Sequence, residues 1–279
     1  RVPPAHRIGL DLSSLRSLVN CSEPVTDAAM ESFYDVFQEY GLAASALETS
    51  YALAENVFAV THSSRGRSTR LEVDADYLAM ADRVREGSGA DGRSLTLVSS
   101  GTCLEHTEVK ICDQTGSRVG EQEIGELWIR SNCLFGGYLD GSDWGNRIEE
   151  GWFRTGDQAR QDEDGYLYIT DRKKDMLLVN GINVYPRELE EVIYQFEGVK
   201  EAAVIGINDP RKGDLVVACG APSEGATIED AALLGFLKDK LAAYKMPRRV
   251  MQMEALPRNA TGKILKTKLR EIAAEKYAR

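Results

Sequence analysis

The sequence has few cysteines and histidines and no long apolar run. Its five cysteines are odd in number and include no Cys-x-x-Cys pair, which indicates reduced thiols in a cytoplasmic protein rather than a disulfide framework. His6, His62 and His106 lie too far apart for ligand spacing, so we expect no metal site built from them. No apolar run approaches the ~20 residues that cross a bilayer, and the start has no signal-peptide pattern, so we expect no transmembrane segment.

An initiator methionine and any internal repeat are also missing. The chain begins Arg1-Val2-Pro3-Pro4, and we therefore expect it to be a piece of a longer protein. Its 279 residues are enough for one large domain or two ordinary ones. The hydrophobic fraction of 43% and the charged fraction of 28% are typical of a globular protein.

The charge of the chain changes sign along its length. Residues 1–170 carry 15 basic and 28 acidic side chains, whereas residues 171–279 carry 19 and 16. The change falls at a charged cluster, Asp171–Asp175, and predicts a domain boundary there, with one domain at 1–171 and a smaller one at 172–279. The net charge of −10 and the absence of aromatic residues among the basic ones argue against a nucleic-acid partner.

The segment from Lys238 to the C-terminus is basic. One interpretation is a solvated helix face, and the other is a surface for phosphate groups. Both remain open at this point. The residues concerned are Lys240, Lys245, Arg248, Arg249, Arg258, Lys263, Lys266, Lys268 and Arg270.

The hydrophobic pattern predicts an α/β first part that ends in a β-rich subdomain, followed by a compact α+β domain. Thr26 can cap a helix that ends at Gly41, and Pro186 suits the first turn of another helix. Residues 63–96 are polar with little periodicity, which predicts a long loop or insertion with one short helix near 75–85. Alternation and turn residues predict strands at 107–113, 125–131, 165–170, 176–181, 201–209 and 214–222, and helices at 229–242 and from 263 onward.

Three short segments stand out when they are taken together. They are "SYALAE" at 50–55, "FRTGD" at 153–157 with "DRKKD" at 171–175, and "PRNATGKI" at 257–264. Each has an ordinary structural explanation by itself. Tyr51 could be a core residue and Asp157 a turn residue, and Gly262-Lys263 lacks the Ser or Thr that a phosphate loop needs next.

In this order and spacing the segments resemble the adenylate-forming ligases, which include acyl-CoA synthetases, fatty acyl-AMP ligases, luciferases and peptide-synthetase adenylation domains. "GELWIRS", "GWFRTGD", "DGYLYITDRKKDMLLVNGINVYPRELEEVI" and "LPRNATGKILKTKLRE" are similar to that family's second half. The resemblance implies an α/β fold: the second half of a large domain with a β-rich subdomain over 1–171, then a small mobile α+β domain over 172–279.

The resemblance also implies a nucleotide site for ATP and AMP. Asp157 would accept hydrogen bonds from both ribose hydroxyls, because a carboxylate has several acceptor positions. Arg172 would add donors to the same ribose. The ring of Tyr51 would lie against adenine, and the backbone around Ser22 and Glu23 would line the edge of that base.

Four further roles follow from the resemblance. Glu55 would hold Mg²⁺, a hard cation that favours carboxylate oxygen. Lys263 would be the catalytic residue, because its ammonium offsets the charge that collects between the incoming carboxylate and the α-phosphate. Lys174 would be the hinge of the small domain, inside a charged cluster that stays solvated. Gly181 would line the thiol channel in a second orientation of that domain.

The chain departs from the family pattern in two ways. Ala54 stands where a hydroxyl is frequent, which removes one phosphate contact. The glycine-, serine- and threonine-rich phosphate loop is absent, so we expect the chain alone to be inactive as an enzyme. A catalytically incomplete nucleotide-binding fragment therefore stays as an alternative.

The connection between Glu55 and Gly101 is long, at 45 residues. A long insert here, about 63–96 with "LEVDADYLA" in it, resembles fatty acyl-AMP ligases. In those enzymes the insert hinders the turn of the small domain toward CoA, and the acyl group passes to a carrier protein. We therefore favour activation of a fatty or other carboxylic acid and transfer to an acyl carrier protein. The alternative is a fatty acyl-CoA synthetase, with CoA as the acceptor, because "GINVYPRELEEVI" suits both.

Overall fold

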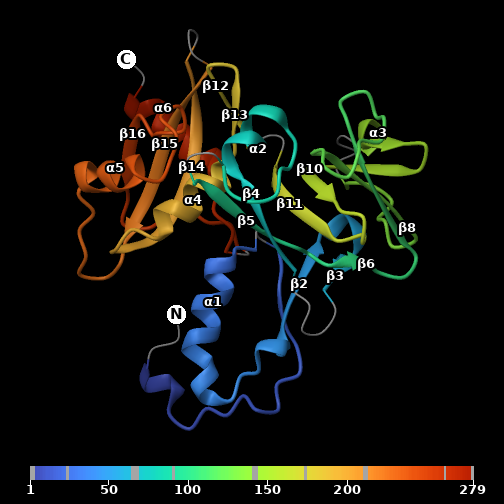
Figure 1. Ribbon diagram of the computed structural model, residues 1–279, viewed down its shortest axis with the longest axis horizontal. Helices are drawn as coiled ribbons and strands as arrows, with labels where there is room; N and C mark the ends of the chain where they lie inside the picture. Colours follow the sequence, from blue (N-terminus) through green and yellow to red (C-terminus); the bar gives the residue numbers. More distant parts are fainter. Residues whose placement is uncertain are drawn as a thin grey trace. The chain divides into compact units, whose positions relative to one another are not determined.

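The computed structural model describes residues 4–22, 25–63, 69–89, 92–139, 144–172, 175–209, 213–260 and 262–277. The chain forms two compact units, each described here by itself. The first unit consists of Arg1–Leu71, Thr96–Thr155 and Ala159–Ile169, and the second of Glu72–Leu95, Gly156–Gln158 and Thr170–Arg279. The α/β fold predicted from the sequence is confirmed (Figure 1).

A β-α-β segment opens the first unit. Strands β1 (Leu18–Asn20) and β2 (Leu47–Ala52) are parallel and flank helix α1 (Asp27–Phe37). The Thr26 side chain accepts a hydrogen bond from the Ala29 backbone N–H at 3.2 Å, which confirms the predicted cap. The other elements of this part are the 3₁₀ turns η1 (Pro4–Arg7), η2 (Gln38–Tyr40), η3 (Ala44–Ala46) and η4 (Ala54–Asn56), and strands β3 (Ala59–His62) and β6 (Thr102–Cys103), with sheet order β1-β2-β3-β6.

The β-rich subdomain is a second sheet with the order β11-β10-β8-β7. Leu127 and Ile129 on β8 are fully buried in a core with Phe153 and Leu167. Trp128, on the opposite face, is also buried, because the cations of neighbouring side chains lie over its ring. The elements are β7 (Thr107–Cys112), β8 (Gly125–Ser131), α3 (Trp144–Arg147), β9 (Ile148–Glu149), β10 (Trp152–Gln161) and β11 (Leu167–Arg172).

The insert has more secondary structure than the long loop expected from its polar sequence, and the short helix predicted near 75–85 is confirmed. It contains β4 (Arg70–Asp74), α2 (Ala75–Ala81) and β5 (Ser94–Val98), and β4 pairs with β5. Asp74 caps α2 by accepting from two backbone N–H groups. The described residues of the insert also bury apolar side chains of their own, namely Val73, Leu78, Ala79, Val84 and Leu95.

The second unit is built on the sheet β13-β12-β15-β14, with β16 beside β15. Helix α4 begins at Pro186 as predicted, because the missing N–H of proline costs nothing in a first turn. The elements are β12 (Leu177–Val179), β13 (Ile182–Val184), α4 (Pro186–Tyr194), β14 (Val199–Asp209), β15 (Gly213–Pro222), α5 (Asp230–Lys238), β16 (Arg249–Gln252) and α6 (Lys266–Tyr277).

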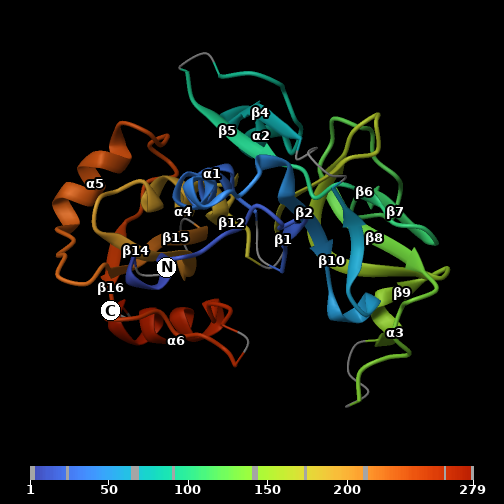
Figure 2. The ribbon, with the colours of Figure 1, turned by 90° about the horizontal axis from the view of Figure 1, so that it is seen from below.

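Both faces of this sheet are covered by helices. Helices α4 and α5 lie on one side of the sheet and α6 lies on the other (Figure 2). Val204 on β14 and Val216 on β15 pack in the core that includes α4 and α5, whereas Ile205 and Val217 pack in the core that includes α6. Successive strand residues face opposite sides, so the two apolar runs of β14 and β15 supply both cores. The predicted small α+β domain therefore has a three-layer architecture. None of the described helices is long and apolar enough to cross a membrane.

Candidate functional site

Ser22 and Tyr51 lie at the same edge of the first sheet. The parallel register pairs Leu18 with Leu47 and Asn20 with Thr49, so both strands end at this edge. Ligands of α/β sheets bind outside the carboxyl ends of the strands. Ser22 follows β1, is exposed and has a positive φ of 73°, a conformation uncommon for a residue with a side chain. Glu23 falls outside the described residues.

Tyr51 is more enclosed than a base-stacking residue would need to be. Its exposed fraction is 9%, and it belongs to the apolar cluster that contains Val60, Val109 and Ile129. A core role for this ring is therefore supported by its packing. Its contact with adenine stays a prediction, and it would involve only the small exposed part of the ring.

Glu55 is held in place from the segment that follows β8. The Tyr138 hydroxyl donates to Glu55 Oε1 at 2.8 Å, and the Phe135 backbone N–H donates to the Glu55 carbonyl at 2.9 Å. One carboxylate oxygen is thus engaged while the side chain stays partly exposed. Within the described ranges no group of three or more His, Cys, Asp and Glu side chains is arranged around a metal position. A Mg²⁺ ion that also binds phosphate oxygens needs only one or two protein carboxylates, and Glu55 fits that requirement.

The backbone directly after Glu55 is strained. Val57 has φ 61° and ψ −55°, and the Phe58 N–H donates to the Asn56 carbonyl at 2.6 Å, which defines a γ-turn. A positive φ is costly for a β-branched residue. The turn leaves the side chains of Val57 and Phe58 76% and 55% exposed. Nothing in the sequence pattern indicated this strain.

In the second unit the structure brings Asp157 and Arg172 together. Arg172 Nε donates to Asp157 Oδ1 at 2.9 Å. Asp157 lies on β10 and is 5% exposed, whereas Arg172 ends β11 and is largely exposed. The sequence predicted that both residues serve one ribose, and their direct contact is compatible with that prediction.

Two described residues of the charged cluster, Asp171 and Asp175, are largely buried, which corrects for them the expectation of a solvated segment. Asp171 is only 9% exposed, and the Asp175 side chain, 13% exposed, pairs with Arg270 of α6 at 2.7 Å. Burial raises the pKa of Asp171 to about 6, although the nearby Lys266 ammonium opposes the shift. Lys173 and the proposed hinge Lys174 lie outside the described residues.

Gly181 is at the tip of a tight hairpin. Asn180 and Gly181 have φ values of 51° and 82° and join β12 to β13, where Val179 pairs with Ile182. Two-residue turns of this kind require positive φ at both positions, for which Asn-Gly is the preferred pair. The space beyond the Gly181 Cα is open.

Lys263 lies on a closed loop that precedes α6. The Leu265 N–H donates to the Pro257 carbonyl at 2.8 Å, and the Asn259 N–H donates to the Lys263 carbonyl at 2.9 Å. The Asn259 side chain in turn accepts from the Lys263 N–H at 2.9 Å. The backbone of the loop is therefore well fixed while the Lys263 side chain is exposed.

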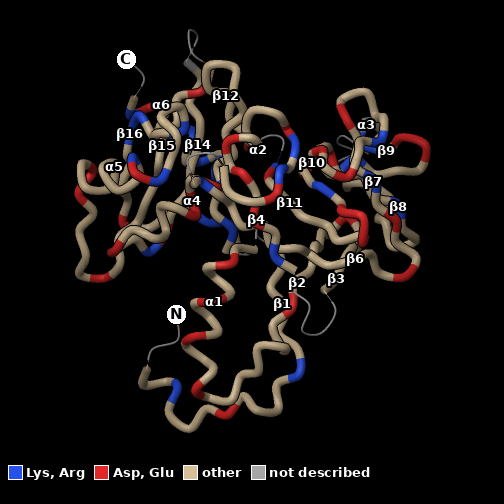
Figure 3. Tube along the Cα trace, viewed as in Figure 1, with Lys and Arg blue, Asp and Glu red and all other residues tan. Residues whose placement is uncertain are grey.

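Most of the basic C-terminal segment is neutralised by carboxylates and does not form a free phosphate surface. Arg258 pairs with Glu201 at 2.9 Å, and Lys268 pairs with Glu271 at 2.9 Å. Lys245, Lys266 and Arg270 also pair with acidic side chains. Figure 3 shows acidic and basic positions interspersed along these elements.

The insert contacts the small-domain elements at two places that the sequence did not reveal. Asp82, at the end of α2, accepts from Asn183 Nδ2 at 2.9 Å and from the Tyr185 hydroxyl at 2.5 Å. Burial, followed by the Asp82 carboxylate, raises the pKa of Tyr185. The second contact is a fully buried ammonium: Lys245 Nζ lies 2.7 Å from Glu188 and 3.1 Å from Asp76 of α2.

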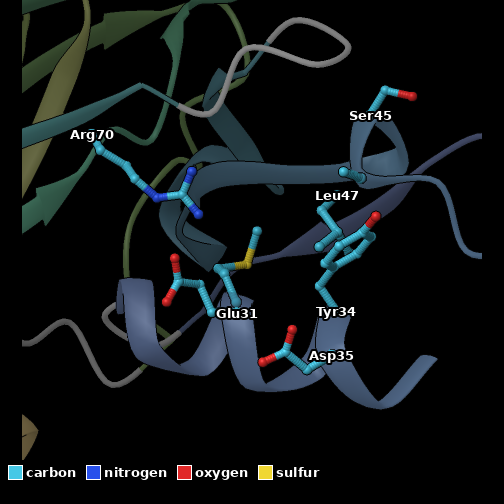
Figure 4. Close-up of a pocket in the computed structure, with 8 residues that line it drawn as sticks. Glu31, Tyr34, Asp35, Ser45, Leu47 and Arg70 are labelled. Atoms are coloured by element: carbon cyan, nitrogen blue, oxygen red, sulfur yellow. The ribbon is translucent and has the colours of Figure 1, made fainter. Parts of the chain in front are cut away.

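A cavity of about 510 Å³ lies apart from these candidates. It is bordered by α1, by the start of β2 and by Arg70, as Figure 4 shows, and it includes none of the predicted site residues. Cavity volume alone therefore does not identify the functional site of this chain.

Two family models match the chain. The model of the AMP-binding enzyme matches residues 3–139, and the model of the AMP-binding enzyme C-terminal domain matches residues 188–263. The long-chain-fatty-acid–CoA ligase of Salmonella typhimurium is 40% identical over 179 residues, which are 64% of this chain and 32% of that relative. The chain thus spans about a third of the length of such curated relatives.

Solved structures agree on the fold. A structure from a study of fatty acyl-adenylate ligases from E. coli and L. pneumophila has a TM-score of 0.84 at 24% identity, covering 100% of this chain and 50% of its own. ATP-bound MatB from Rhodopseudomonas palustris has a TM-score of 0.72 at 28% identity, and the match covers 94% of this chain and 46% of MatB. The two family models together match most of the chain, which belongs to the AMP-binding family of adenylate-forming enzymes.

Proposed function

We propose that the whole protein uses ATP to convert a fatty or other carboxylic acid into an acyl adenylate. The carboxylate oxygen attacks the α-phosphorus, a new P–O bond forms, and pyrophosphate leaves. The observation that carries the proposal is the contact between Asp157 and Arg172, a carboxylate and a guanidinium placed together at adjacent strands. The family membership and the name of the fatty-acid ligase relative support the same reaction.

The proposed roles follow from the chemistry of each side chain. Asp157 and Arg172 bind the ribose, and Ser22, Glu23 and Tyr51 bind the adenine. When Mg²⁺ is bound, it offsets charge on the phosphates, and Glu55 is the carboxylate that would hold it. The exposed Lys263 ammonium stabilises the charge that develops between the attacking carboxylate and the α-phosphate. A fixed backbone suits that task, because only the side chain then has to be ordered at the site.

For the second step we favour a carrier-protein thiol as the acceptor over CoA. In that step the thiolate attacks the acyl carbon and AMP leaves. The support comes from the insert, which resembles that of fatty acyl-AMP ligases and holds the elements next to Gly181. Asp82 bonds to Asn183 and Tyr185 beside the Gly181 hairpin. Such bonds would restrain the hairpin whose residue Gly181 would line the thiol channel.

The second candidate is a fatty acyl-CoA synthetase, which the names of the curated relatives favour. The third is a nucleotide-binding fragment without turnover. This third candidate is favoured for the 279-residue chain when it is taken by itself, because the phosphate-loop motif is missing from its sequence.

One experiment separates the three candidates. The whole protein is incubated with ATP, Mg²⁺ and a panel of carboxylic acids, with a phosphopantetheinylated carrier protein, CoA or no acceptor, and products are identified by mass spectrometry. The proposal predicts acyl-AMP without acceptor and acyl transfer to the carrier. Acyl-CoA as the main product would support the synthetase, and the absence of acyl-AMP with every acid would overturn the enzymatic proposal.

A further inference from the structure

A network of charged side chains lies at the start of α6 and is largely shielded from solvent. Its centre is Lys266, the first residue of α6, whose side chain is 21% exposed. Lys266 Nζ lies 2.7 Å from Glu190 Oε1 on α4. Burial by itself would lower the pKa of Lys266, but Glu190, Asp171 and Asp175 together raise it. The ammonium therefore stays charged and pairs with α4, in the electrostatic field of the Asp171 and Asp175 carboxylates.

Each acidic partner is itself fixed by other bonds. Glu190 Oε1 also accepts from the Val204 N–H of β14 at 2.7 Å. Asp171 accepts from the Arg172 N–H at 2.7 Å, and Asp175 is held by Arg270. Through Glu190, Lys266 is thus tied to a framework made of α4 and β14. The two partly buried ion pairs of this network stabilise the fold more than surface ion pairs would, because water screens the attraction between their charges less.

The loop that carries Lys263 ends where this network begins. Its C-terminal side passes through Leu265, hydrogen-bonded to Pro257, directly into Lys266. Its N-terminal side is held by Arg258, whose guanidinium pairs with Glu201 of β14 at 2.9 Å. The loop is therefore anchored on both sides, by Arg258 and by Lys266.

We infer that Lys266 is a positioning residue that fixes the Lys263 loop to α4 through its ion pair with Glu190. Lys266 itself contacts no reacting atom in this role. When the small domain turns, the anchored loop moves with the framework, so Lys263 arrives at a reproducible place. A displacement of about 1 Å at a catalytic group costs on the order of 100-fold in rate, so an anchor of this kind has a large effect. The inference deepens the proposed function and rests on it for the role of Lys263.

The anchoring is tested on the chain of 279 residues by amide hydrogen exchange with mass spectrometry. Lys266→Met should make peptides that cover 257–265 exchange about tenfold faster, because loss of a buried ion pair promotes local opening. Lys268→Met is the matched control, since Lys268 lies on the same helix, is 57% exposed and pairs only with Glu271 among the described residues. Lys266→Arg should restore slow exchange. Unchanged exchange in Lys266→Met would overturn the inference.

A second variant tests the anchor in case Lys266→Met does not fold. Glu190→Gln retains an oxygen that can accept from Val204 but loses the charge that binds Lys266. If circular dichroism shows that Lys266→Met is unfolded, Glu190→Gln should still give faster exchange at 257–265, and wild-type exchange there would count against the anchor.

The catalytic consequence is measured on the whole protein. Lys266→Met should lower kcat for acyl-AMP formation about 100-fold with little change in the KM for ATP, while transfer from pre-formed acyl-AMP is retained. If no acid gives acyl-AMP, the proposed function is wrong, and if Lys263→Ala has no effect on acyl-AMP formation, the proposed role of Lys263 is wrong; in both cases the exchange result still decides the anchoring. If Lys263→Ala abolishes the reaction and Lys266→Met leaves kcat unchanged, the positioning role is refuted.

Discussion

Arg172 Nε lies 2.9 Å from Asp157 Oδ1, and the two side chains are 54% and 8% exposed. The pair thus combines a buried acceptor with an accessible donor. An exposed ion pair contributes little to stability, which makes ligand binding the more informative property to measure.

Asp157→Ala should weaken AMP binding by about 1.5–3 kcal/mol, the range for a hydrogen bond to a charged group. Isothermal titration calorimetry of the whole protein measures this change. Glu108→Ala is a suitable control, because Glu108 is an exposed carboxylate on β7 that also pairs with an arginine. Equal AMP affinity in wild type and Asp157→Ala would remove the ribose assignment.

Glu55→Gln should raise the Mg²⁺ concentration needed for pyrophosphate exchange about 100-fold, because a neutral amide is a poorer ligand for a hard cation. Tyr138→Phe keeps the carboxylate but loses the hydroxyl that orients it, so about a tenfold increase is expected. A Mg²⁺ titration of the exchange rate provides both values. If Glu55→Gln and wild type have the same Mg²⁺ requirement, Glu55 is not the metal ligand.

Asp82→Ala should increase acyl-CoA formation relative to free acyl-AMP about tenfold, which corresponds to about 1.4 kcal/mol of lost restraint. The reason is that one carboxylate holds both Asn183 and Tyr185. Met80→Ala is the control, because Met80 lies on α2 and its side chain is 64% exposed. The product ratio is measured by chromatography, and an unchanged ratio in Asp82→Ala would contradict restraint by the insert.

Asp171 makes the stability of the chain depend on pH. Its pKa is about 6 in the folded protein, against an ordinary value of 3.8. Because the folded state holds the proton more tightly, the stabilisation is complete below about pH 4 and is lost as the pH rises through 6. The loss amounts to about 3 kcal/mol, since one pKa unit corresponds to 1.36 kcal/mol.

Asp171→Asn should therefore become more stable relative to wild type between pH 4 and pH 7, as measured by urea unfolding. The Asp113→Asn variant is expected to show the opposite change: it should become less stable relative to wild type as the pH rises. The Thr115 hydroxyl and nearby backbone N–H groups lower the pKa of Asp113, so its stabilisation is present above about pH 4 and is lost as the pH falls. A pH-independent difference between Asp171→Asn and wild type would show that Asp171 does not titrate in this range.

Several features were predictable from the sequence because their causes are local. Thr26 and Pro186 mark helix starts through the chemistry of the backbone N–H groups beside them. The apolar runs of β14 and β15 are a property of adjacent residues and predict two strands. The candidate residues themselves came from the family resemblance, since Tyr51 and Asp157 have ordinary structural explanations when taken alone.

The features that the sequence did not reveal depend on partners far along the chain. Asp171 and Asp175 appear solvated in a charged run, but their partners come from α4 and α6. In the sequence Lys245 belongs to the basic C-terminal segment, but in the structure it is buried against Asp76 of the insert. The insert itself was expected to be mostly loop because its composition is polar, and its order comes from a cap at Asp74 and from tertiary contacts.

The central claim is that Lys263 acts in adenylate formation, and the rates of the two half-reactions of Lys263→Ala in the whole protein test it most directly. Acyl-AMP formation is followed by pyrophosphate release, and transfer is followed from pre-formed acyl-AMP to the thiol acceptor. We predict a loss of about 100- to 1000-fold in adenylate formation, the range for removing one preorganised charge-stabilising group, with transfer retained. Equal loss in both half-reactions, or no loss in either, would contradict the account.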